Sequence, residues 1–343
     1  MKGNNGTRAL LSALLLILTA ASALLLNWSE QGFPALLPPK RQASATAEPS
    51  PVPTVAPTVA PTPQPTPEPT AEPTPEPTPQ RVWSGPFGEK FADKFTDGEV
   101  VQTDLSYRSA NVSVTLERVE ENGVIYYVAD VYVSDVTYLR CGFVRGRYNG
   151  GFQPIDELSR SVGAIVAITG DHYAGRYEGL VLRNGEWYRD VRFEDVCVLY
   201  RDGRMETVDM RAVDVKALKE RDDIWQIWSF GPALLDDEGH AKSSFNTIVY
   251  PANPRSAIGY FEPGHYCLVE VEGSRGGAYS GSRGMDMGQL AALFESLGCQ
   301  SAYNLDGGRS AAIAWMGELV STDYGRSIPD IIYVADALPE QEG

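Results

Sequence analysis

The sequence predicts an α+β domain over residues 81–343, with a β-rich mixed sheet as its core, hairpins and a few packing helices. Three observations support this fold class. Apolar and polar residues alternate in several segments, as they do in a strand with one buried face. Dipeptides suited to tight hairpin turns lie between such segments. One segment carries a strong helical stripe, and we therefore expect strands and hairpins to surround a single hydrophobic core.

Strands are expected where β-branched and aromatic residues alternate with polar ones or form short apolar runs between turn signals. Residues 124–133 are the longest such run and are rich in Val, Ile and Tyr. The other expected strands lie at residues 112–116, 164–168, 257–260, 266–272, 302–303, 311–316 and 331–334.

Two hairpins are expected in the middle of the chain. Asn184-Gly185 separates residues 180–182 from residues 187–188, and this dipeptide suits a type I′ turn because both positions tolerate positive φ. Asp202-Gly203 is expected to form a similar turn between residues 198–200 and Met205. Each pair of strands is therefore expected to fold back on itself.

One strongly amphipathic helix is expected between Asp286 and Gly298. Asp286 and Gln289 have the spacing of a capping box, and Gly298 is placed to end the helix. A weaker helix is expected over residues 213–221. The apolar stripe of the first helix, at positions i, i+3, i+4 and i+7, consists of Leu290, Leu293, Phe294 and Leu297.

The N-terminal part of the chain predicts a membrane anchor. Residues 9–26 are 18 consecutive residues without a charge, and at ~1.5 Å per residue they cover about 27 Å, enough to span a bilayer core. Lys2 and Arg8 precede them, so residues 1–8 are expected in the cytoplasm and the domain outside it, at the cell membrane. A cleaved signal peptide, for which Ala21-Ser22-Ala23 offers a cleavage pattern, is the alternative and gives the same location.

Residues 27–80 predict a disordered stalk rich in Pro, Thr and Glu. Sixteen of the 24 prolines fall between residues 31 and 80, and Pro-Thr-Pro-Glu recurs at 65–68 and 73–76. Such a segment lacks the large apolar residues of a core, and its prolines remove backbone donors. We expect an extended spacer that holds the domain away from the membrane.

Composition excludes several functions. With 45 acidic against 29 basic residues the net charge is −16, and no basic stripe is present to bind nucleic acid. The three histidines and four cysteines contain no CxxC pair and form no zinc pattern. No cofactor is expected, while a calcium ion stays open, as do the oligomeric state and the choice between two disulfides and buried thiols.

Asp306 lies in the most unusual segment of the chain, Asn-Leu-Asp-Gly-Gly-Arg-Ser from Asn304 to Ser310. A carboxylate at the end of a buried strand, followed by Gly307 and Gly308, is placed where backbone can approach a ligand closely. The alternative is a tight turn in which Asp306 bonds its own backbone.

Two other segments carry chemistry. An apolar strand ends in Gly170-Asp171-His172, which again puts a carboxylate at a strand end, beside a histidine that is a candidate base or a solvated surface residue. Residues 253–259 deliver Arg255 just before a strand, where its guanidinium suits a phosphate or carboxylate, or one of the chain's own acidic side chains.

With these segments in this order, the sequence resembles the phosphodiester glycosidase family from about residue 124 to residue 334. Residues 304–308 resemble the family's Asn-Leu-Asp-Gly-Gly-Gly-Ser-Ser signature, and residues 253–259 its Pro-Arg-Thr-Ala-Ile-Gly element. Residues 168–175 resemble its Ile-Asn-Gly-Asp-Tyr-Tyr element. Residues 230–239 match the stretch with Phe-Gly-Pro and an apolar strand that ends in glycine.

The resemblance implies hydrolysis of a sugar-1-phosphodiester on the glycosidic side, in a cell-surface glycan such as an exopolysaccharide or wall polymer. The leaving group is a phosphate monoester with a second pKa near ~6, which departs without a strong general acid. The candidates for base or nucleophile are Asp306, Asp171 and His172. The candidates for substrate or phosphate binding are Gly170, Arg255, Asn304, Gly307, Gly308, Arg309 and Ser310.

Three positions depart from the family pattern: Thr169 replaces an Asn, Arg309 the third glycine and Ala311 a serine. Arg309 either adds a phosphate contact or blocks the pocket, and if its position requires positive φ it strains the turn by ~1–2 kcal/mol. These departures keep an alternative open, a non-catalytic carbohydrate- or cell-wall-binding domain that retains the fold.

Overall fold

The computed structural model describes residues 85–337. The chain divides into two units, Met1–Pro75 and Glu76–Gly343, and all the described residues belong to the second. The expected anchor at 9–26, the stalk at 27–80 and the domain start at 81 lie outside the described residues. Within the described part, no helix is both long enough and apolar enough to cross a membrane.

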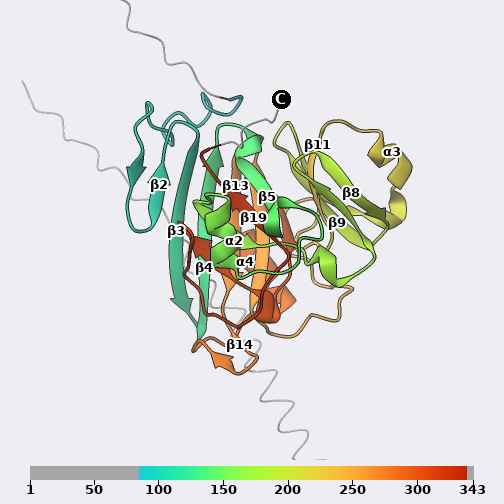
Figure 1. Ribbon diagram of the computed structural model, residues 1–343. Coiled ribbons are helices and arrows are strands. Elements are labelled where there is room, and N and C mark those ends of the chain that lie inside the picture. The colour runs from blue at the N-terminus through green and yellow to red at the C-terminus, as the bar shows by residue number, and fades with distance from the viewer. Residues whose placement is uncertain (1–84, 338–343) are drawn as a thin grey trace, which may run out of the picture. The chain divides into compact units, whose positions relative to one another are not determined.

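The largest sheet has seven strands in the order β1-β2-β3-β4-β13-β12-β16 (Figure 1). Its two longest strands, β3 and β4, cover the strands expected at 112–116 and 124–133, and they pair with each other as a hairpin. The strands are β1 Val101–Gln102, β2 Ser106–Arg108, β3 Val112–Glu121, β4 Val124–Val133, β12 Arg255–Glu262, β13 His265–Val271 and β16 Ser301–Asn304.

Two five-stranded sheets and one small hairpin complete the β structure. The second sheet, in the order β18-β17-β6-β19-β5, has β5 Leu139–Phe143, β6 Val166–Thr169, β17 Ile313–Trp315, β18 Glu318–Leu319 and β19 Asp330–Val334. The third, in the order β10-β9-β11-β7-β8, has β7 Gly179–Arg183, β8 Glu186–Val191, β9 Asp195–Tyr200, β10 Met205–Asp209 and β11 Ile224–Trp228. The hairpin consists of β14 Ser274–Arg275 and β15 Ala278–Tyr279.

Strand pairing corrects the expectation of a mixed sheet. Every strand pair among residues 85–337 is antiparallel. Hairpins account for neighbours such as β3 and β4, and the longer connections also return each strand in the opposite direction. The α+β class and the dominance of strands are confirmed.

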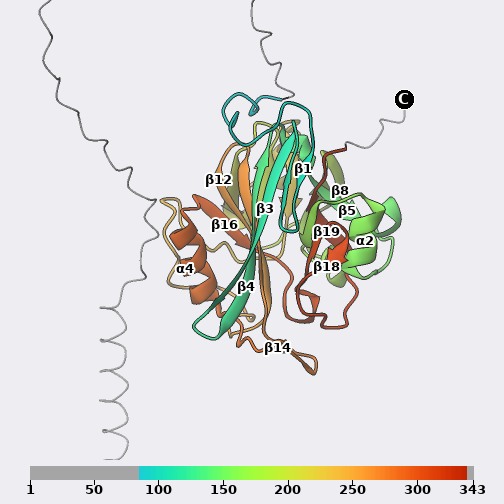
Figure 2. The ribbon, with the colours of Figure 1, turned by 90° about the vertical axis from the view of Figure 1, so that its left-hand side faces the viewer.

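The helices cover outer faces of the sheets. Figure 2 shows α4 and α2 on opposite sides of the stacked sheets, and Figure 1 shows α3 beside β8, β9 and β11. The α-helices are α2 Ile155–Ser161, α3 Val215–Lys219 and α4 Met287–Leu297. The short 3-10 helices are η1 Val136–Tyr138, η2 Val144–Gly146, η3 Tyr173–Gly175, η4 Met210–Ala212 and η5 Gly308–Ser310.

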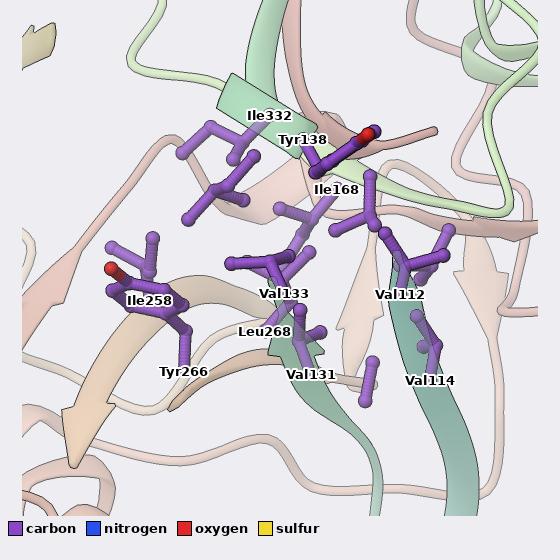
Figure 3. Close-up of a cluster of buried hydrophobic side chains, with 14 of the residues drawn as sticks. Val112, Val114, Val131, Val133, Tyr138, Ile168, Ile258, Tyr266, Leu268 and Ile332 are labelled. Atoms are coloured by element: carbon purple, nitrogen blue, oxygen red, sulfur yellow. The ribbon is translucent and has the colours of Figure 1, made fainter. Parts of the chain in front are cut away.

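The hydrophobic interior is divided into several clusters, so the expectation of one core was wrong. The largest lies between the first two sheets and joins Val131 and Leu268 to Ile168 and Ile332 (Figure 3). A separate cluster packs α4, through side chains such as Phe294, on the other face of the first sheet. Further clusters pack α2 on the second sheet and α3 on the third. A sheet with apolar side chains on both faces needs a layer on each, and one core cannot supply both.

Local signals in the sequence are confirmed. Asp286 and Gln289 form the full capping box of α4, and Gly298 ends that helix at φ 85°. Asn184 and Gly185 have φ values of 53° and 84°, as a type I′ turn between β7 and β8 requires. The weaker helix is shorter than expected, because η4 precedes α3 and the helix covers only Val215–Lys219.

The four cysteines are buried free thiols. The sulfurs of Cys267 and Cys299 lie 3.7 Å apart, well beyond the ~2.05 Å of a disulfide. Trp228 donates its indole N–H to the sulfur of Cys141. The question left open by the sequence is thus answered in favour of thiols in this structure.

Candidate active site

Segments from the three sheets meet at one place, and backbone hydrogen bonds join them. Asp306, just after β16, donates its N–H to the carbonyl of Gly170, just after β6, at 3.1 Å. Asn304 donates its side-chain amide to the carbonyl of Gly231, in the segment after β11, at 2.7 Å. Gly308 donates to the carbonyl of Pro254, just before β12, at 2.8 Å. The three candidate segments of the sequence, and the Phe-Gly-Pro segment, are therefore neighbours.

Asp306 is 6% exposed and is only partly hydrogen-bonded. Its Oδ2 lies 3.5 Å from Nδ1 of His172, longer than an ordinary hydrogen bond. Among the described residues neither of these two buried atoms has a hydrogen-bond partner. Burial raises the pKa of Asp306, and the neighbouring His172 opposes part of that rise. We call these two residues the Asp306 pair.

His172 is held so that its Nδ1 faces Asp306. Arg326 lies with its Nη2 3.3 Å from Nε2 of His172. Since a guanidinium only donates, Nε2 accepts and the neutral ring carries its proton on Nδ1. The backbone of His172 is left-handed, at φ 54°, and a Cβ at Gly175 would lie 2.0 Å from Nε2, so only glycine fits there. Burial lowers the pKa of His172 and favours the neutral ring.

Four arginines line a cavity of about 240 Å³ that has Asp306, Gly307 and Gly308 in its wall. A site with this many guanidinium groups favours an anion, although the whole chain is strongly acidic. The sequence identified two of the four, while the others come from the β14–β15 hairpin and from the loop before β19. The four are Arg255, Arg275, Arg309 and Arg326.

Arg255 is already bound to the protein. Its Nε donates to the carbonyl of Met285 at 3.0 Å, and its Nη2 lies within hydrogen-bond distance of the carbonyls of Val249, Tyr250 and Pro251. Burial lowers the pKa of Arg255 to about 10. The side chain thus holds the loop before β12 in place. Nη1 is the nitrogen without a hydrogen bond among the described residues, and the phosphate-clamp role stays a prediction.

The two glycines of the signature allow close approach of backbone to backbone. A Cβ on Gly307 would lie 2.7 Å from the carbonyl oxygen of Pro254, and Gly308 has φ 60°. The N–H of Gly308 is used by Pro254 and is therefore not free to bind an anion. Glycine is required here for the turn, and of the two backbone N–H groups expected to bind substrate or phosphate at most that of Gly307 is left.

The departures from the family pattern are accommodated. Arg309 does not have a positive φ, so the backbone strain considered for this position does not arise. Its Nε and Nη2 donate to the carbonyls of Tyr324 and Gly325, each at 3.2 Å. Thr169 donates its hydroxyl to the carbonyl of Ser310 at 2.5 Å, and Ala311 is buried. Arg309 is held along one wall of the pocket.

Asp171 has a different environment from Asp306, although both follow buried strands. Its Oδ1 lies 2.7 Å from Nη2 of Arg183, and its Oδ2 accepts the N–H of Ser229 at 2.8 Å. The same Nη2 lies 3.2 Å from Oδ2 of Asp330. We call Asp171, Arg183 and Asp330 the Arg183 cluster. Both oxygens of Asp171 are engaged, which favours a structural role, and the base or nucleophile role expected from the sequence stays a prediction.

Asp330 completes this cluster beneath the site. Burial and the charge of Asp171 raise the pKa of Asp330 to about 7, while Arg183 opposes the rise. A Cβ on Gly170 would lie 2.4 Å from Oδ2 of Asp330. Gly170, a candidate substrate contact in the sequence, therefore packs against this carboxyl group.

Two further candidates have buried polar atoms without partners. Oδ1 of Asn304 and Oγ of Ser310 make no hydrogen bond within residues 85–337. Both residues belong to the segment that carries Asp306. Unsatisfied buried polar atoms are uncommon, and such atoms beside a pocket are suited to contact a ligand.

Sequence reasoning missed Arg183, Asp330, Arg275 and Arg326. A signal existed for the first two: an arginine ends the apolar run 180–182, and a carboxylate begins the apolar strand 331–334. A buried charge needs a partner, so these two could have been paired with Asp171. The other two arginines lie in loops without a recognisable pattern.

Metal binding has no obvious place in the described part of the chain. No three His, Cys, Asp or Glu side chains converge there so that they could hold an ion.

Several known proteins are similar to parts of this chain. The SPbeta prophage-derived uncharacterized protein YomE of Bacillus subtilis is 31% identical over 169 residues, which are 47% of this chain and 25% of YomE. The chain thus matches a quarter of the length of that curated relative. A hypothetical protein from Synechocystis is 15% identical with a TM-score of 0.44, over 66% of this chain and 62% of the other.

The catalytic domain of zebrafish N-acetylglucosamine-1-phosphodiester alpha-N-acetylglucosaminidase, auto-inhibited by its pro-peptide, has a similar fold. It has a TM-score of 0.52 at 17% identity, over 66% of this chain and 83% of that domain. The sequence profile of the phosphodiester glycosidases matches residues 162–335, half of the chain, and this range includes all three candidate segments. This chain therefore belongs to the phosphodiester glycosidase family.

Proposed function

We propose that the protein hydrolyses the glycosidic bond of a sugar-1-phosphodiester in a cell-surface glycan. One observation carries the proposal: the buried, partly unbonded carboxylate of Asp306 faces His172 at the edge of a pocket lined by four arginines. The family to which the chain belongs, and the zebrafish enzyme with a similar fold, are glycosidases, which supports a hydrolase.

The pocket suits the charge of this substrate. A phosphodiester is an anion, and its departure as a phosphate monoester adds negative charge on the same group. Arg275 and Arg326 are exposed side chains at the pocket, where guanidinium groups can bind phosphate oxygens in pairs. Stabilising charge that grows in the transition state accelerates the reaction more than binding the substrate alone.

Asp306 is the group that activates water or attacks the anomeric carbon. Its ionised form is required, and a buried carboxylate that has lost water is a stronger base than an exposed one. His172 presents its Nδ1–H to Oδ2 and Arg326 fixes the ring, so the pair keeps the carboxylate oriented. Asp171 directly precedes His172 in the chain. Arg183 and Ser229 bind its two oxygens, and this holds the backbone that carries His172 in place.

The position of bond cleavage tests the reaction. Methyl N-acetylglucosamine-1-phosphodiester in H₂¹⁸O is expected to give free sugar labelled at C1 and unlabelled methyl phosphate. Label in the phosphate would mean attack at phosphorus and a phosphodiesterase. Loss of labelled sugar in Asp306→Asn assigns the activity to this pocket, and Arg118→Ala, at an exposed position that lines neither the pocket nor the cavities beside it, serves as the control variant.

The location is part of the proposal. We propose that residues 9–26 anchor the chain in the cell membrane and that residues 27–80 extend the domain toward a surface or wall glycan. Accessibility of the domain to an added protease in intact cells, with lysed cells as the control, tests the location. Protection from the protease in intact cells would contradict it.

A non-catalytic carbohydrate-binding domain is the competing function. The departures at Thr169, Arg309 and Ala311 raised it, although Thr169 and Arg309 are hydrogen-bonded within the protein and Ala311 is buried. Binding of a glycan without turnover of any sugar-1-phosphodiester would favour that function instead.

A further inference from the structure

The pocket of the Asp306 pair opens into a longer groove. A cavity of about 580 Å³ adjoins it and shares Phe230 and Val249 with it. A third cavity of about 510 Å³ continues from the second and shares residues such as Pro232 and Phe245 with it. Cavities of this size each hold a drug-sized ligand, so the groove has room for more than one sugar unit.

The middle of the groove differs in chemistry from the arginine-lined pocket. Its walls include Phe193, Phe230, Phe245 and Ile248. Its one arginine, Arg176, lies over two of these rings, 4.7 Å from the centroid of Phe193 and 4.8 Å from that of Phe230. Apolar walls with a few polar groups suit the faces and hydroxyls of sugar rings, whereas the arginine-lined pocket suits the phosphate.

Apolar side chains at the groove are unusually exposed. Ile248 lines the groove and is 99% exposed, and Tyr177, between the groove residues Arg176 and Glu178, is 90% exposed. Exposed apolar groups gathered at one cleft mark a surface that another molecule covers. The groove is continuous with the pocket, so a substrate bound in the pocket can reach these side chains.

The order of groups along the substrate sets its direction. The anomeric carbon is the atom of the sugar ring that carries the phosphate, so the rest of the ring lies on the side away from the phosphate. With the phosphate among the arginines and the carbon at Asp306, the ring and the units attached to it extend past Phe230 into the groove. Arg176 marks the junction, since its charge reaches both Asp306 and His172.

We infer that the glycosyl half of the substrate is an oligosaccharide, whose further sugar units lie along the groove of Arg176, Phe193, Phe230 and Ile248. This inference rests on the proposed function. It adds that the protein acts at the reducing end of a chain, where a single sugar would leave the groove empty.

The test compares three probes with one leaving group, the methyl phosphodiesters of N-acetylglucosamine, chitobiose and chitotriose. The full chain is expected to give a kcat/KM about tenfold higher for the longest probe than for the shortest. Ile248→Asp is expected to remove most of that gain, because it places a carboxylate where the chain lies. Val100→Asp, at an equally β-branched and 54% exposed position outside the groove, is expected to keep it.

Three outcomes separate this inference from the proposed function. Equal kcat/KM for all probes would overturn the oligosaccharide and leave the hydrolase intact. If no probe is cleaved, the proposed reaction fails for this sugar, and binding of free chitotriose, measured by ligand-observed NMR, tests the groove alone. Binding that Ile248→Asp abolishes supports the groove, and no binding to the unaltered chain overturns it.

Discussion

The Asp306 pair and the Arg183 cluster each contain an aspartate that follows a buried strand, Asp306 and Asp171, and the two differ in how their carboxylate oxygens are bonded. Asp171 has an arginine on one oxygen and a backbone N–H on the other. Asp306 has an oxygen without a hydrogen bond, facing a neutral histidine at 3.5 Å. Both follow a buried strand and are nearly inaccessible to water.

This difference separates a structural role from a chemical one. A buried carboxylate that is fully paired stabilises its surroundings and cannot act on a substrate without breaking those bonds. A buried carboxylate that lacks partners is costly to the fold and available for reaction. The comparison predicts that changes in the Arg183 cluster affect folding, and changes in the Asp306 pair affect turnover.

The largest effect on folding is expected from Arg183→Leu. The substitution leaves Asp171 and Asp330 buried without their cation, and it should lower the free energy of unfolding by about 3–5 kcal/mol. Urea denaturation followed by circular dichroism measures it. Arg211→Leu is the control, because the pair of Arg211 with Asp209 is exposed and should be worth about 0–1 kcal/mol. Equal effects of the two variants would remove the distinction between the clusters.

His172→Asn should lower kcat/KM about 10²-fold and leave the unfolding free energy nearly unchanged. Asparagine tolerates the left-handed backbone of this position. Burial raises the pKa of Asp306, and His172 counteracts that rise. Without the imidazole, the pKa of Asp306 rises further, and the acidic limb of the pH–rate profile should move to higher pH. An unmoved limb, measured between pH 4 and 9, would exclude this coupling.

Asp330→Asn should change how stability depends on pH. The pKa of Asp330 is raised to about 7 in the folded protein, against ~3.9 in the unfolded chain, so the folded state holds the extra proton between these values. The stability that the folded protein gains by holding this proton on Asp330 is fully present below pH 4 and is lost as the pH rises toward 7. Asparagine does not titrate, so the variant does not lose this stability as the pH rises. Its free energy of unfolding relative to that of the unaltered protein should therefore increase between pH 4 and pH 7. Denaturation at pH 4.5 and pH 8 would show it, and parallel changes in both proteins would count against the raised pKa.

The smallest effect is expected from Arg309→Gly, which restores the family's third glycine. The backbone at this position is unstrained and the side chain is held by the carbonyls of Tyr324 and Gly325. The rate should change by no more than about threefold. A gain of more than tenfold would mean that Arg309 obstructs the pocket after all.

Features that depend on neighbouring residues were predictable from the sequence. The Asn184-Gly185 turn and the capping box of α4 each involve residues a few positions apart, and both are as expected. The three segments of the site were found in the same way, each as a carboxylate or arginine next to a buried strand. The sequence also placed Asp306 and His172 among the candidates.

Features that depend on distant residues were not predictable. Asp171 and Asp306 have the same local pattern, and only the arrival of Arg183 and Asp330 from other strands makes one structural. The guanidinium of Arg255 was a candidate for phosphate binding, and in the structure its Nε donates to the carbonyl of Met285, 30 residues away. A pattern shows which groups can react, and the packing of the sheets decides which of them keep free atoms.

The central claim is that Asp306, and no other buried carboxylate, carries the reaction. The most direct measurement is the rate of hydrolysis of methyl N-acetylglucosamine-1-phosphodiester by the full chain and by Asp306→Asn, with the unfolding free energy of both. The account predicts a rate lower by about 10³-fold, with an unfolding free energy equal or higher because a buried unpaired charge is removed. A variant that keeps its rate to within tenfold would contradict the account.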